Sequence, residues 1–148
     1  MIRFFLATLL FSSIAINAAL MLFFAGVYRK MMDASDSATF KSQTELLVCF
    51  SSKSSFMIVV LNLPLLVAVP YYYVCGLGSW LVTVGLLLWL ISGSVAKVMK
   101  LPVYKRIAVV KDEDTAALNE LRKKLNNGNR FQAWLYVLAT AVVGVGIY

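Results

Sequence analysis

Two asparagines are the most polar side chains within the long apolar runs of this sequence, and chemistry is possible around them. Asn17 lies near the middle of one run and Asn62 near the middle of the next, two residues before Pro64. Proline lacks an N–H, so Val60, four residues earlier, would carry a free carbonyl. Asn17, Asn62 and Pro64 are therefore a candidate intramembrane polar site for a small ligand. A hydrogen bond between helices is the simpler interpretation, and we favour it.

The last apolar run offers packing surfaces instead of reactive groups. Its small side chains recur at Thr140, Ala141, Gly144 and Gly146. Small residues let helix backbones approach closely within a bilayer. Because these positions cover more than one helix face, we expect one face to pack inside the protein. The other face, around Gly144 or Gly146, is expected to contact another subunit or a second copy.

A basic cluster follows the third apolar run, at Lys97, Lys100, Lys105 and Arg106. Such a cluster could bind anionic lipid headgroups. It is also the ordinary orientation signal beside a membrane span, and that interpretation is the simpler one. The net charge of +7 could suggest a nucleic-acid partner. Because the basic residues lie beside the apolar runs, their placement indicates a membrane protein instead, and we expect no nucleic-acid partner.

Residue types that carry catalysis or bind metals are scarce. The sequence has no histidine and two cysteines, Cys49 and Cys75. A helix joining the cysteines would separate them by roughly 39 Å, whereas a disulfide requires Cα atoms within about 7 Å. No Asp, Glu, Lys or Arg lies deep in an apolar run, which disfavours ion-coupled transport. We expect no catalytic residue, no cofactor and no metal.

Four apolar runs must position these residues, at 4–28, 54–74, 80–96 and 131–148. Membrane-spanning helices need about 17–25 residues, and the sequence is 61% hydrophobic, against about 45–50% in soluble domains. We predict one all-α domain, an integral membrane four-helix bundle. We expect the proline-containing run 54–74 to be central, with the others packed around it. A glycine turn should join it to run 80–96 as an antiparallel hairpin.

The polar connections, 29–53 and 97–130, should contain further helix. Ser42 and Glu45 fit a capping box that would start a helix before run 54–74. Residues 112–127 predict a short amphipathic surface helix, with acids first, bases last and Gly128 closing it. Leucines recur on one face of that helix, at Leu118, Leu121 and Leu125.

Charge placement predicts the orientation. Of the 14 lysines and arginines, only Arg3 lies outside the two polar connections. The positive-inside rule then places both connections in the cytoplasm and both termini outside. We expect a multi-pass protein of the bacterial inner membrane, with the mitochondrial inner membrane as the alternative.

The last third of the chain carries a resemblance. After the third run comes LPVYKRI at 101–107, then a charged stretch, then Asn129 and Arg130 leading into Trp134. This order resembles small four-helix bacterial membrane proteins of uncharacterised function, some relatives of which are linked to anthrone oxygenation. The resemblance implies a four-helix membrane fold. Val103 and Tyr104 stand where that pattern commonly has asparagine, and no active-site residue is carried over.

These observations favour a non-catalytic role. We expect an accessory or structural subunit of a larger membrane complex, with the lipid bilayer and other membrane subunits or a second copy as partners. The alternatives are a cofactorless membrane enzyme or binder of a small hydrophobic molecule, and a homo-oligomeric channel or transporter.

Overall fold

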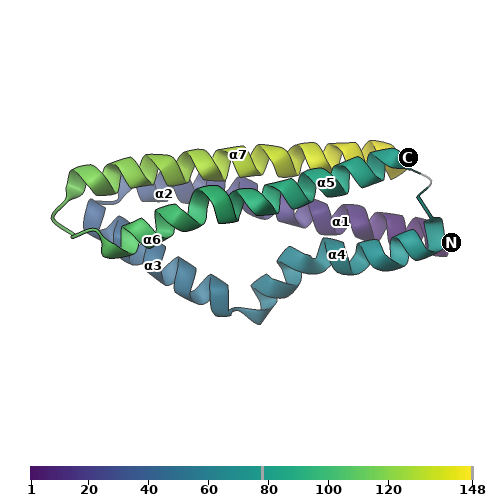
Figure 1. Ribbon diagram of the computed structural model, residues 1–148, viewed down its shortest axis with the longest axis horizontal. Coiled ribbons are helices and arrows are strands. Elements are labelled where there is room, and N and C mark those ends of the chain that lie inside the picture. The colour runs from purple at the N-terminus through teal and green to yellow at the C-terminus, as the bar shows by residue number, and fades with distance from the viewer. Residues whose placement is uncertain (78, 148) are drawn as a thin grey trace.

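The computed structural model describes residues 1–77 and 79–147, and the protein is all-α (Figure 1). Its elements are α1 (Ile2–Phe23), the π-helical segment η1 (Phe24–Tyr28), α2 (Arg29–Ala34), α3 (Ser37–Lys53), α4 (Ser55–Cys75), α5 (Trp80–Val95), the π-helical segment η2 (Ala96–Lys100), α6 (Leu101–Val109) and α7 (Thr115–Ile147). Four continuous helices are long and apolar enough to cross a membrane: Ile2–Ala34, Ser55–Cys75, Trp80–Val109 and Thr115–Ile147. By length and composition, the prediction of an all-α, multi-pass membrane protein is confirmed.

The last helix is longer than the sequence pattern indicated. A separate surface helix over 112–127 is wrong, because α7 runs unbroken from Thr115 through Gly128 to Ile147. Asp114 begins it by accepting a hydrogen bond from the Ala117 N–H at 3.0 Å. A Cβ on Gly128 would lie 3.2 Å from Cγ of Lys100. Gly128 therefore permits close side-chain packing and does not end the helix.

The predicted capping box is also wrong. Ser42 is an exposed residue inside α3, and the helix begins earlier, where Asp36 Oδ1 accepts the Thr39 N–H at 2.8 Å. Hydrogen bonds from the backbone and hydroxyl of Thr39 lower the pKa of the Asp36 carboxyl. The stabilisation from this cap is present at neutral pH and is lost as the pH falls through that lowered pKa.

α7, and not the proline-containing helix, is the central element. It packs against both α5 and α1, whereas α4 packs mainly against α1. The expected central position of run 54–74 is therefore wrong, and Leu66 of α4 is 62% exposed. α7 carries glycines on two faces, with Gly144 beside Phe11 of α1 and Gly146 beside Leu81 of α5. Small residues allow it to contact two neighbours closely.

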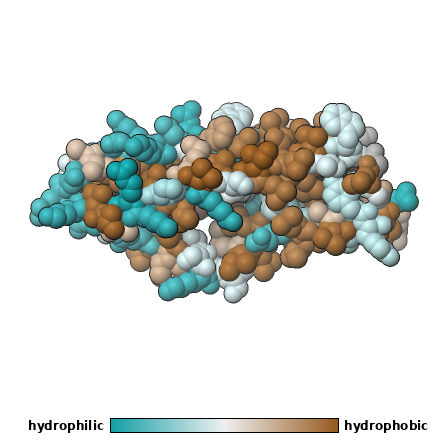
Figure 2. Space-filling view, in the orientation of Figure 1, coloured by the Kyte–Doolittle hydropathy of each residue, from teal (hydrophilic) through white to brown (hydrophobic). Residues whose placement is uncertain are grey.

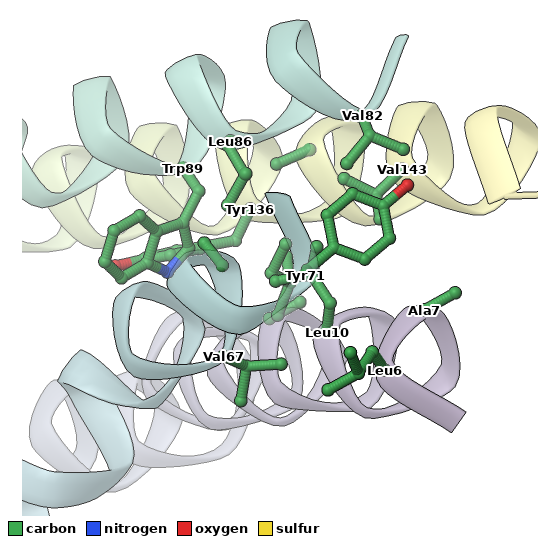
Figure 3. Close-up of a cluster of buried hydrophobic side chains, with 14 of the residues drawn as sticks. Leu6, Ala7, Leu10, Val67, Tyr71, Val82, Leu86, Trp89, Tyr136 and Val143 are labelled. Atoms are coloured by element: carbon green, nitrogen blue, oxygen red, sulfur yellow. The ribbon is translucent and has the colours of Figure 1, made fainter. Parts of the chain in front are cut away.

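Two apolar clusters hold the helices together. The larger one joins α1, α4, α5 and α7 (Figure 3) and contains Leu10, Ile14, Tyr71, Val82, Trp89, Ala139 and Val143 among others. The smaller one joins α2, α3, α6 and α7 and consists of Met32, Phe40, Val103, Ile107, Leu121 and Leu125. The prediction that Leu118, Leu121 and Leu125 share one helix face is confirmed, and the structure shows that this face is buried.

The molecule has a hydrophilic and a hydrophobic part. Figure 2 shows hydrophilic residues gathered at one end, which we call the polar end, and hydrophobic residues over the rest. The polar end contains α2, α3, α6 and the start of α7, and both termini lie at the opposite end (Figure 1). This arrangement matches the sequence division into two polar connections and four apolar runs.

Candidate functional site

A break between α3 and α4 opens the molecule on one side. Ser54 has extended backbone angles, φ −76° and ψ 110°, and its hydroxyl accepts the Met57 N–H at 3.3 Å. The two helices therefore meet at an angle, and we call residues 53–55 the knee (Figure 1). At the far end of α3, the Lys41 ammonium donates to Val110 O at 2.8 Å and to Asp112 Oδ1 at 2.7 Å. We call α3 and α4 together the strap, and the remaining helices the body. Lys41 holds the start of the strap, and packing of α4 on α1 holds its end. At the knee the strap stands away from the body (Figure 1).

The predicted hairpin of runs 54–74 and 80–96 is limited to the region of their turn. There, the hydroxyls of Tyr72 and Thr83 share a hydrogen bond of 2.8 Å. Beyond it α4 follows α1 while α5 follows α7. The strap and the body therefore border a partly open cavity of about 540 Å³, visible as a hollow above the knee in Figure 2.

The cavity changes character along its length. We call the part toward the polar end its polar half, which includes Thr44, Ser51, Lys97, Lys100 and Asn129. We call the part deeper in the apolar region its apolar half, which includes Met21, Leu61, Leu65, Trp89 and Leu90, with Asn62 as a polar side chain among them. Because the four helices cross the apolar region side by side, this gradient follows the direction expected for a bilayer, from headgroups to hydrocarbon.

Lys100 is the most unusual residue of the polar half. It is 8% exposed, and its ammonium donates to Gln132 Oε1 at 2.9 Å. Gln132 is fixed in turn, because its side-chain Nε2 donates to Ser92 O at 3.1 Å and its backbone oxygen accepts from Ser92 Oγ at 3.1 Å. Among the residues that the structure describes, Lys100 forms no ion pair. A buried charge without a counter-ion is costly.

Two features of the backbone place Lys100 inside. Along α5, η2 and α6 the buried positions from Val82 to Ile107 are never more than four residues apart, except between Val95 and Lys100, where the step is five. This step is the π-helical segment η2, and segments of this kind are frequent at functional sites. The aliphatic stem of Lys100 then passes over Gly128 of α7, where a larger residue would obstruct it.

Two further polar atoms on the cavity wall lack a partner. The Thr44 hydroxyl and the Trp89 indole N–H are buried and make no hydrogen bond within the described chain. The Trp89 ring extends from α5 toward the interior (Figure 3). The other π-helical segment, η1, also borders the cavity, through Phe24 and Tyr28. Other buried polar atoms of the described chain also lack a partner, on Thr8, Asn17, Arg29 and Arg122, but Thr44 and Trp89 are the two of this set that line the cavity.

The asparagines do not form a shared site. Asn17 is fully buried, and its amide donates to Ser13 O at 2.9 Å and to Val60 O at 3.1 Å. Asn17 therefore satisfies the carbonyl that Pro64 leaves free, and the favoured interhelical hydrogen bond is confirmed for Asn17. Asn62 is exposed, bonds Ile58 O of its own helix at 2.8 Å and borders the cavity.

The expected outward glycine face is wrong. A Cβ on Gly144 would lie 3.2 Å from the Phe11 ring, and one on Gly146 would lie 2.8 Å from Cβ of Leu81. Both glycines therefore face neighbouring helices of the same chain. Thr140 is half-buried and bonds Tyr136 O, and only Ala141 of the four is exposed.

The basic cluster divides in the structure. Lys97, Lys105 and Arg106 are exposed, whereas Lys100 is buried, so the expected surface role of Lys100 is wrong. The sequence signal for the cavity was weak, because Lys100, Gln132 and Trp89 line one cavity only through the packing of α5 and η2 on α7. Within residues 1–77 and 79–147, no group of three or more His, Cys, Asp or Glu is placed to hold a metal.

No protein-family model, curated protein or solved structure matches this chain.

Proposed function

We propose that this is a membrane protein that binds a small amphiphilic molecule inside its cavity. The observation that carries the proposal is the cavity itself, about 540 Å³ in volume and graded from polar to apolar. Ligand pockets in proteins have volumes of about 300–1,000 Å³, with mostly apolar walls and a few placed polar groups. Lys100, Thr44 and Trp89 are such groups here.

This proposal takes precedence over the role of accessory subunit. One support for a subunit was an outward face around Gly144 and Gly146, but these glycines pack against α1 and α5. The other support, the scarcity of catalytic and ion-coupling residues, is equally compatible with a binding protein. Binding alone is proposed, without a reaction or a transport step.

We also propose that the polar end lies in the cytoplasm and the protein in a bacterial inner membrane. Thirteen of the 14 lysines and arginines in the sequence belong to the two polar connections, which supports this orientation. The polar half of the cavity then lies at the depth of the inner-leaflet headgroups.

Quenching of Trp89 fluorescence tests the proposal. Trp80 and Trp134 are exposed and are replaced by phenylalanine, so that Trp89 alone reports. The protein is placed in nanodiscs of neutral phosphatidylcholine and titrated with a brominated fatty-acid methyl ester, which quenches tryptophan on contact. We expect saturable quenching.

A pair of glycine variants supplies the control. Gly93 borders the cavity, and neither Gly93 nor Gly26 has a heavy atom within 4 Å of an added Cβ. Gly93→Phe should fill the cavity and weaken binding at least tenfold, whereas Gly26→Phe should leave it unchanged. Unsaturable quenching that is equal in both variants would indicate contact through the lipid phase and contradict the proposal.

A further inference from the structure

We infer that the polar half of the cavity holds the anionic headgroup of a single-chain amphiphile, a carboxylate or phosphate monoester, with Lys100 as its counter-ion. This inference rests on the proposed function, since it names the chemical class of the ligand in the same cavity. Three observations support it: the charge of the wall, the unused donors, and the backbone features that keep Lys100 inside.

The wall of the cavity carries positive charge only. Its lining residues include Lys97 and Lys100 and, among the described residues, no aspartate or glutamate. Gln132 contacts Lys100 through a neutral amide oxygen. An anion entering this half of the cavity would therefore meet the ammonium group of Lys100 and no repelling carboxylate on the wall, while the exposed Lys97 adds positive charge at its edge.

Donors remain available for the oxygens of such a headgroup. A lysine ammonium has three N–H donors, and Lys100 directs one of them to Gln132. The Thr44 hydroxyl, on α3 across the cavity, is buried and has no partner in the described chain. Charge-assisted hydrogen bonds to carboxylate or phosphate oxygens are the strongest that these groups form.

The position of Lys100 is built into the helices. A lysine at the end of a membrane span ordinarily extends its charge to the surface. Here the five-residue step of η2 rotates Lys100 inward, and Gly128 leaves room for its stem. The neighbouring Lys97, Lys105 and Arg106 follow the ordinary pattern and are exposed. If Lys100 served only as a positive charge at the end of the span, neither the five-residue step of η2 nor the glycine at position 128 would be required.

The apolar half fits one alkyl chain. Lys100 and Trp89 are eleven residues apart on α5 and η2, which corresponds to roughly 16 Å along the helix axis. Met21, Leu61, Leu65 and Leu90 line this length. A headgroup at Lys100 would therefore direct its chain past these side chains toward Trp89.

The test compares ligands that differ only in charge. The Trp89 reporter protein in neutral nanodiscs is titrated with a brominated fatty acid, with its methyl ester and with a brominated alkyl phosphate. We expect at least one of the two anions to bind ten times more tightly than the ester. Whichever anion binds more tightly identifies the headgroup.

Substitutions assign the effect to one residue. Lys100→Met should reduce anion affinity to the level of the ester and leave ester binding unchanged, and Lys105→Met, at an exposed position, should change neither. Gly128→Ala, which keeps the lysine but crowds its stem, should weaken anion binding in the same direction, and it provides a second test should Lys100→Met fold poorly.

The outcomes separate the two proposals. Equal binding of acid, phosphate and ester, unchanged in Lys100→Met, would overturn the inference and leave the proposed function standing. No saturable binding of any probe would contradict the proposed function itself. Displacement by inorganic phosphate would assign the site to a free anion, and loss of binding in phosphatidylglycerol nanodiscs would assign it to a two-chain bilayer lipid. Either result overturns the single-chain assignment.

Discussion

Two glycines of α5 show how differently one residue type is used within one helix. A Cβ on Gly85 would overlap the Val143 side chain and lie 3.1 Å from Ala139 O, whereas a Cβ on Gly93 would meet nothing within 4 Å. We predict that Gly85→Ala lowers stability by about 1–3 kcal/mol through overpacking. Gly93→Ala should raise it by up to about 1 kcal/mol through helix propensity.

Thermal unfolding of both variants in one detergent, followed by circular dichroism, measures the difference. The wild-type protein is the reference for both. If Gly85→Ala melted at or above the temperature of the wild type, the close packing of α5 on α7 would be refuted.

The pair formed by Asn17 and Val60 gives a second prediction at this scale. Asn17→Leu leaves the Val60 carbonyl without its donor, and a buried unsatisfied group costs about 1–3 kcal/mol. Pro64→Ala restores a backbone N–H that can bond the same carbonyl. We therefore predict that Asn17→Leu is much less destabilising in a Pro64→Ala background, as a double-mutant cycle measures it. Equal costs in both backgrounds would show that Asn17 does not serve this carbonyl.

The helices themselves differ in continuity from their sequence pattern. α7 passes through Gly128 without interruption, while the strap breaks at Ser54. At the start of α4 the first backbone hydrogen bond runs from Ile58 N to Ser54 O at 3.0 Å. The N–H groups of Ser55 and Phe56 therefore have no helical acceptor.

Hydrogen exchange of the backbone amides distinguishes these two places. We predict slow exchange at 127–129, inside α7, and fast exchange at 55–56, at the knee. The two segments serve as controls for each other in one sample. Fast exchange at 127–129 would indicate that the helix ends near Gly128, as the sequence pattern predicted.

For the whole molecule, the polar end and the end that carries the termini should face opposite compartments. We predict that Asn127→Cys resists an impermeant thiol reagent in intact cells and that a cysteine added after Tyr148 reacts, because positive-inside orientation places the polar end in the cytoplasm. Cys49 is exposed and Cys75 half-buried, so both are first changed to serine. The opposite labelling pattern would invert the proposed orientation.

The sequence was sufficient for the presence of four long apolar helices, but not for where each helix begins and ends or for the cavity. Long apolar runs are a local signal, so the presence of four long apolar helices was predicted correctly, and so was the shared face of Leu118, Leu121 and Leu125 in α7. The positions of Lys100 and Gly128 were not, since both depend on how α5 and η2 rotate against α7. The same limit explains the asparagines, which were both recognised as polar positions. Only helix rotation decides that Asn17 reaches Val60 of α4, whereas Asn62 bonds its own helix and borders the cavity.

Native mass spectrometry of the protein, released from membranes in mild detergent, tests the central claim most directly. The claim is that the cavity binds one small amphiphilic molecule. We predict that the wild type and Gly26→Phe each carry one added small mass, and that Gly93→Phe, with its cavity filled, carries none. A wild type without any added mass, or a Gly93→Phe variant that retains the same one, would contradict the account.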